Sequence, residues 1–155
     1  MKEKLYILLI EKIKSEISQL EKIYDSAVIA VQKADGRMQS RYDTQRFDYA
    51  QEAEHTKELI ELKKHQLDYF QRARIEVTRK AAIPETVSIG TLVETMLNGE
   101  KQRFLIAPSG GGIEVPEHNC VVISDKAPIA EKLKGKHIGS KVRLPIGEAE
   151  IIGLY

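Results

Sequence analysis

Proline and glycine are distributed so unevenly that they divide this chain into two unlike halves at Val77–Glu85. All five prolines and nine of the ten glycines lie in or after this seam, and the part before it holds only Gly36. Both residue types disfavour helix interiors, because glycine costs backbone entropy and proline lacks a donor N–H. The first half can therefore form long helices. The second half, with short β-branched runs between turn residues, is typical of a small α+β domain.

Apolar or small residues recur along the first half at steps of three and four. The first stripe comprises Ile10, Ile13, Ile17, Leu20, Tyr24, Ala27, Val31 and Ala34, with Leu9, Ile23, Val28 and Ile29 beside it. A second, less regular stripe comprises Tyr49, Ala53, Ile60, Leu67 and Phe70, with Leu59, Leu62 and Tyr69 beside it. This spacing predicts an antiparallel α-helical coiled-coil hairpin over residues 1–79, with its second helix at about Ser40 to Arg79.

Turn signals divide the second half into short elements. After a linker at 80–86, the domain at 87–155 is expected to hold antiparallel strands and one short helix opened by Pro128. The expected strands are Val87–Leu97, Arg103–Ile106, Cys120–Ile123, Lys141–Leu144 and Ala149–Gly153, and the helix is Pro128–Lys134. Asn98-Gly99 predicts a hairpin turn. The glycines at 110–112 are read as a flexible connection, because no Lys-[Ser/Thr] pair follows them as in a phosphate-binding loop.

The charges of the chain are balanced and exclude several classes of function. Residues 1–79 hold 15 basic and 14 acidic side chains, which leaves nine of each for the remainder. Autonomous nucleic-acid binding needs a cationic excess, so docking on a protein is favoured, with any nucleic acid contacted through that partner. No apolar run could span a bilayer, no secretion signal is evident, and a cytoplasmic protein is expected.

Few residues in the sequence suggest chemistry of their own. The lone Cys120 lies in an apolar run and is interpreted as a small core residue. The four histidines show no paired metal spacing, and nothing marks a nucleophile with its base. The chain is therefore expected not to be an enzyme in itself, and no intrinsic cofactor is expected.

The polar turn between the two helices, at residues 35–48, is the candidate site of action. Its Asp43 has two readings. Ser40 and Asp43 have the spacing of a helix-capping box, which needs no partner. Alternatively, a carboxylate at the end of an arm can complete a magnesium site held elsewhere. Arg46, three residues on, shares a helical face with Asp43 and would compete for it.

The segment Ala127–Val142 carries a resemblance to a known family. Its sequence, Ala-Pro-Ile-Ala-Glu-Lys-Leu-Lys-Gly-Lys-His-Ile-Gly-Ser-Lys-Val, resembles the Ser-Pro-[Ile/Leu]-[Ala/Gly]-x-x-Leu-x-Gly-Lys-x-x-Gly-Asp-x-Val motif of the bacterial Gre transcript-cleavage and elongation factors. The order and length of the two halves also agree with that family. Ala127 and Ser140 replace the usual Ser and Asp of the motif.

The resemblance implies an FKBP-like second domain that docks at the rim of the RNA polymerase secondary channel. Docking is expected through Lys126, Ala127, Pro128 and Ile129, while the hairpin enters toward the active centre. Two tip acids of the family help to hold a catalytic magnesium ion there. Asp43 matches the first acid, and Arg46 stands where the second, a glutamate, is expected.

The tip string Tyr42-Asp43-Thr44-Gln45-Arg46 is similar to that of a divergent Gre-like subgroup. It leaves the action open between modulation of transcript cleavage or pausing and binding that inhibits the polymerase without cleavage. A coiled-coil adaptor or dimer with no polymerase role is the alternative from another class. A prolyl isomerase is disfavoured, because Phe104 and Tyr155 are the only aromatic residues of the second half.

Overall fold

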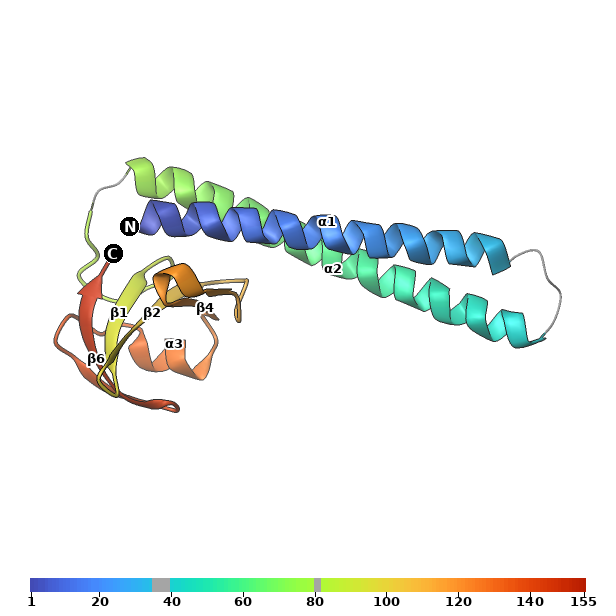
Figure 1. Cartoon of the computed structure of the whole chain (residues 1–155). Helices are drawn as coiled ribbons and strands as arrows, with labels where there is room; N and C mark the ends of the chain where they lie inside the picture. The colour runs from blue at the N-terminus through green and yellow to red at the C-terminus, as the bar shows by residue number, and fades with distance from the viewer. Residues whose placement is uncertain (35–39, 80–81) are drawn as a thin grey trace. The chain divides into compact units, whose positions relative to one another are not determined.

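The computed structural model describes residues 1–34, 40–79 and 82–155, with the side chains of 34 and 40–43 outside the description (Figure 1). Two long helices come first, and strands with a short helix follow, which is the α+β class that the sequence predicts. The elements are α1 (Lys2–Ala34), α2 (Ser40–Arg79), β1 (Leu92–Leu97), β2 (Glu100–Ala107), β3 (Glu114–Val115), the 3-10 turn η1 (Pro116–His118), β4 (Cys120–Ser124), α3 (Pro128–Leu133), β5 (Lys141–Leu144) and β6 (Gly147–Leu154).

The chain forms two compact units. One is Ile10–Tyr69, and the other combines Met1–Leu9 with Phe70–Tyr155. The first turns of α1 and the last turns of α2 therefore belong to the same unit as the sheet. The sequence boundaries at 79, 80–86 and 87 stay predictions.

Ion pairs show that α1 and α2 run antiparallel. Arg74 Nη2, late in α2, lies 3.8 Å from Glu3 Oε1, early in α1, whereas Lys63 Nζ, farther back in α2, lies 2.6 Å from Glu16 Oε2. The buried side chains of α1 include Ile10, Ile13, Ile17 and Ala27, as its stripe predicts. The hairpin is therefore closed by an apolar seam with ion pairs beside it.

The seam of α2 is more polar than its apolar pattern predicts. Ala53 and Ile60 are buried as expected, but Thr56 and Gln66 are buried too, while Tyr49 and Leu62 are exposed. Thr56 Oγ1 donates to the carbonyl of Glu52 at 2.7 Å, which satisfies its hydroxyl inside the seam. Oε1 of Gln66 has no hydrogen-bond partner among the described residues. Hydropathy alone missed these positions because polar residues occupy part of the inward face.

The sheet has the strand order β3-β4-β2-β1-β6-β5. The prediction of an antiparallel sheet is wrong at one place, because β2 and β4 pair in parallel and the sheet is mixed. β3 lies between β2 and β4 in the sequence and runs antiparallel to β4. The chain therefore reverses direction at β3, and β4 runs in the same direction as β2. Hydrophobic runs indicate strands but carry no information about partners or direction.

The first strand begins later than the predicted Val87. Gly90 has φ +86°, and Thr91 N donates to Ser88 O at 3.1 Å, so a turn precedes β1. Val87 instead exchanges two backbone hydrogen bonds with the segment after α3. Its N–H donates to Lys136 O at 2.8 Å, and its carbonyl accepts from Gly135 N at 2.9 Å. The Asn98-Gly99 turn is confirmed, with φ 50° and 87° between β1 and β2.

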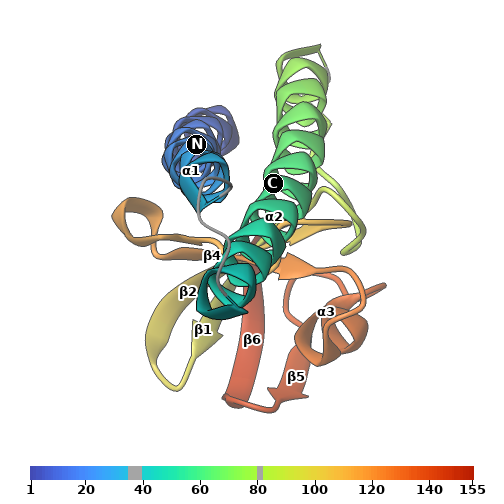
Figure 2. The ribbon, with the colours of Figure 1, turned by 90° about the vertical axis from the view of Figure 1, so that its right-hand side faces the viewer.

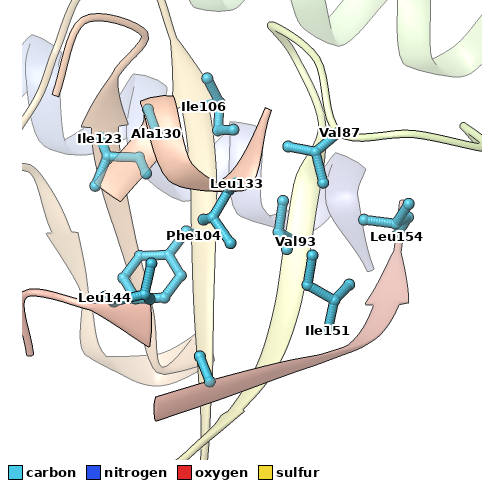
Figure 3. Close-up of a cluster of buried hydrophobic side chains, with 11 residues drawn as sticks. Val87, Val93, Phe104, Ile106, Ile123, Ala130, Leu133, Leu144, Ile151 and Leu154 are labelled. Carbon is cyan, nitrogen blue, oxygen red and sulfur yellow. The ribbon is translucent and has the colours of Figure 1, made fainter. Parts of the chain in front are cut away.

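One face of the sheet is covered by α3, which lies beside the β5 edge (Figure 2). Ala130 and Leu133 of α3 are fully buried against side chains of the sheet, among them Phe104 and Ile151 (Figure 3). These two positions lie three apart and so share one face of the helix. The rest of this short helix is thereby held at the surface in a fixed orientation.

Aromatic packing within the second unit joins the two long helices to each other and to the loop that follows β2. The rings of Tyr6 and Phe70 lie 6.1 Å apart at their centroids, and both side chains are fully buried. Gly110, with φ +87°, lies against Phe70, since a Cβ there would lie 3.1 Å from the ring. The glycine connection is therefore a packed contact in the structure, and glycine is needed at position 110 for both its φ and its lack of a side chain.

Burial makes a prediction for Cys120, the only cysteine. Burial raises the pKa of its thiol to about 12. A backbone hydrogen bond to Leu105 and the charge of Arg103 lower this pKa, but their effect is smaller than that of burial. At pH 8 the native protein should therefore react with Ellman's reagent at least a hundredfold more slowly than free cysteine, because the thiolate is the reactive form. Urea-unfolded protein, the control, should react at the rate of free cysteine. Rapid reaction of the folded protein would contradict this assignment.

Candidate functional site

The predicted tip lies in the first turns of α2. Residues 40–43 have helical backbone, but the side chains of Tyr42 and Asp43 lie outside the described residues. Thr44 and Arg46 are exposed on the same helix, and each makes an interaction within the chain. Because the backbone is helical from Ser40 on, positions 43 and 46 share a face, as the sequence predicts. The metal-holding role of Asp43 and its capping role both stay predictions.

Apolar side chains are exposed along the distal part of the hairpin. Phe47 is 61% exposed and Tyr49 39% exposed on α2, and Ile29 is 50% exposed on α1. In α2, every residue from 44 to 52 is exposed, so this stretch contributes nothing to the buried seam. Exposed aromatic residues of this size are common where a partner covers a surface.

The predicted docking segment, residues 126–129, covers the end of the connection from β4 and the first two residues of α3. Lys126 and Pro128 are exposed, while Ala127 and Ile129 are half-buried and pack against the domain core. Ala127 N donates to Ser124 O at 2.9 Å, which closes a tight turn before the helix. The four residues are therefore brought together on one surface, with a rigid backbone beneath them.

Ala127 occupies the N-cap position of α3. Its backbone is extended, with φ −67° and ψ 146°, and no side chain caps the helix. Pro128 follows at the first helical position, where a missing N–H costs nothing. The motif serine of the Gre-like pattern would place a hydroxyl at this cap, so its replacement by alanine leaves the helix start uncapped.

Ser140, the second departure from the motif, keeps a structural role. Its N–H donates to His137 O at 3.1 Å, and its Oγ accepts from His137 N at 3.2 Å. Gly139, with φ +86°, supplies the positive φ that this turn requires. The serine hydroxyl thus accepts the turn N–H much as an aspartate carboxylate would.

The residues that sequence reasoning missed surround the C-terminal end of α3. Lys132, Lys134, Lys136, Lys141 and Arg143, with Glu131 and Val142, line a surface depression of about 470 Å³. Only the folded chain brings these cations together, because α3 ends at Leu133 and the chain then turns back along β5. The alternation of lysine at 132, 134 and 136 was the available sequence signal.

The described residues hold few other groups that suggest chemistry of their own. No group of three or more His, Cys, Asp or Glu side chains is arranged to hold a metal ion there. None of the described helices is long and apolar enough to cross a membrane. The carboxylate of Glu94 is buried, but it pairs with Arg103 at 3.2 Å and Lys101 at 3.5 Å, an arrangement that stabilises the sheet.

Comparison with known proteins finds no matching family model and no matching curated protein. Three solved structures are similar to this chain. They are GreA factor homolog 1 (Gfh1) of Thermus thermophilus (16% identity, TM-score 0.40, 94% of each chain covered), a structure of the transcription factor Gfh1 (18%, 0.39, 94% of this chain and 92% of the other) and Gfh1 of Thermus aquaticus (18%, 0.38, 94% and 92%). At these identities and TM-scores, the likeness does not assign a function.

The uncapped helix start makes a prediction about stability. Replacing Ala127 with Ser should raise the free energy of unfolding by about 1 kcal/mol, because the hydroxyl can accept an N–H of the first turn of α3. Urea denaturation followed by circular dichroism measures the change. Ala127→Val, which adds atoms without an acceptor, should give no gain. Equal stabilisation by both variants would show that packing, and not capping, limits this position.

Proposed function

We propose that this chain is a Gre-type regulator of transcription elongation that binds RNA polymerase in its secondary channel. The observation that carries the proposal is the motif at 127–142 in its structural context. The motif forms α3 and the turn to β5, and at the start of α3 it leaves Pro128 exposed beside Lys126. An antiparallel helical hairpin precedes this domain, in the order that the family resemblance requires.

In this proposal the polymerase rim is contacted through residues 126–129. Lys126 and Pro128 present a charge and a rigid ring to solvent, and the half-buried Ile129 links them to the core. Ala130 and Leu133, both fully buried, fix the orientation of α3 and so of this surface. Rim binding by a preformed surface of this kind avoids the entropic cost of ordering a loop.

The hairpin would then place Tyr42, Asp43 and Arg46 near the polymerase active centre. Exposed apolar side chains of its distal part, such as Phe47 and Ile29, would be covered there. The protein itself would not be an enzyme, since the chemistry would belong to the polymerase and its magnesium ions. Nucleic acid would be contacted only within that complex.

A second candidate function, binding that inhibits without cleavage, is favoured by Arg46. Positions 43 and 46 lie three apart on a helical backbone, a spacing at which an arginine can pair with a carboxylate. A carboxylate engaged by a guanidinium is a weaker ligand for magnesium. We therefore expect the protein to modulate elongation or pausing and to stimulate cleavage only weakly.

The docking surface is tested by charge reversal. Lys126→Glu should lower the affinity for bacterial core RNA polymerase at least tenfold, measured by fluorescence anisotropy of the labelled full-length protein. Arg143→Glu makes the same change elsewhere on the domain and should leave the affinity within about twofold. Wild-type protein that fails to bind, or to be displaced by a known secondary-channel binder, would refute the proposal and favour an adaptor role.

The tip is tested on a backtracked elongation complex, with shortened RNA as the readout. The wild-type protein should give at most weak cleavage. Arg46→Glu, which restores a second acid, should increase cleavage at least fivefold, and adding Asp43→Ala to it should abolish the gain. Strong wild-type cleavage that is lost in Asp43→Ala would show that one acid suffices, and would exclude the purely inhibitory function.

A further inference from the structure

We propose that the depression between α3 and the free edge of β5 binds an extended acidic segment of another polypeptide, which adds to the sheet as a further strand. This surface lies at the opposite end of α3 from residues 126–129. It is therefore distinct from the proposed polymerase contact and does not depend on it.

The backbone of β5 offers hydrogen-bonding groups at the edge of the sheet. β5 is the last strand in the order, and no other described strand pairs with its outer side. Ile151 N donates to Ser140 O at 3.0 Å, and Leu144 faces Gly147 across a two-residue turn. Because antiparallel bonding alternates, Val142 and Leu144 bond toward β6, while Lys141 and Arg143 direct their N–H and C=O groups outward.

The charges around this edge favour an acidic partner. Five cationic residues and Glu131 line the depression, and the side chains of Lys141 and Arg143, which alternate with Val142 and the core residue Leu144, lie on the face of the sheet away from α3. Lys134 lies 3.9 Å from Asp125, whereas none of the other four cations forms an ion pair among the described residues. Lys132, Lys134 and Lys136 come from α3 and the residues after it, so cations approach the edge from the helix side as well as from β5.

The acids on β6 specify the spacing of the partner. Lys141 faces Glu150 and Arg143 faces Glu148 in the β5–β6 pair. Each of these cations therefore has an acid on one side and an open position on the other. Acidic residues two apart on an added strand would occupy those positions, since residues i and i+2 of a strand lie on the same face.

A polypeptide fits this edge better than a nucleic acid does. The outward groups of Lys141 and Arg143 include carbonyls, which a peptide N–H can satisfy and a phosphate cannot. A second copy of this chain fits poorly, because pairing β5 with β5 would bring cations against cations. Charged side chains on an edge strand often serve only to prevent association, and the test must separate that role from binding.

The probe is a fluorescein-labelled, capped peptide of seven glutamates, which carries acids on both faces of an added strand, titrated with the full-length protein and followed by anisotropy. We expect saturable binding in the micromolar to submillimolar range that weakens at least fivefold between 50 and 300 mM salt (on the order of a halved Debye length). Lys132→Glu/Lys136→Glu should weaken binding at least tenfold. Lys14→Glu/Lys22→Glu, an equal charge change on exposed sites of α1, should have no effect.

A proline substitution tests strand addition itself. Arg143→Ala removes one charge, whereas Arg143→Pro also removes an outward N–H that the sheet does not use. The proline variant should bind at least fivefold more weakly than the alanine variant, with both folded by circular dichroism. Absence of saturable binding would leave the charged edge as protection against association and overturn the proposal. Equal binding by the two variants, or tighter binding of a single-stranded RNA of equal charge, would overturn it as well.

Discussion

The packing of α3 on the sheet is the interaction on which the functional surfaces of this protein depend. Ala130 and Leu133 bury one side of a helix that has only six residues and no side-chain cap, so tertiary contacts rather than intrinsic propensity hold it in place. The proposed docking segment, residues 126–129, includes the start of the helix, and the cationic depression includes the end of the helix and the residues after it. One buried pair therefore orients two separate surfaces, and loss of that packing would disturb both together.

Much of the fold could be predicted from the sequence, because it is specified by local signals. The absence of proline before Val77, and of any glycine there but Gly36, predicts the long helices, and Asn98-Gly99 predicts its turn through the positive φ of both residues. The parallel β2–β4 pair could not be predicted in this way. The relative direction of two strands depends on how the chain between them is folded, and local sequence signals do not specify it. Val87 misled the strand assignment for a similar reason: its backbone bonds to residues 135 and 136, far away in the sequence.

The candidate sites also differ in whether their residues are contiguous in the sequence. The proposed docking segment could be named from the sequence because Pro128 and the following motif are contiguous, and its docking role stays a prediction. The cationic depression could not, because it combines the end of a helix with an edge strand beyond a turn. Capping also required the structure: the sequence shows Ala127 in place of a serine, but only the backbone angles identify that position as the helix cap.

The polar seam of the hairpin limits how far one helix can slide along the other. An all-apolar seam tolerates a shift of one helix along the other by a heptad, about 10 Å, because the replaced contacts are alike. Here such a shift would part Glu16 from Lys63 and move Thr56 and Gln66 against different neighbours. The polar contacts therefore favour one register of the two helices. Adding or removing one residue within α1 or α2 would shift the residues beyond it by about 1.5 Å along the helix and turn them by about 100°, out of register with these polar contacts.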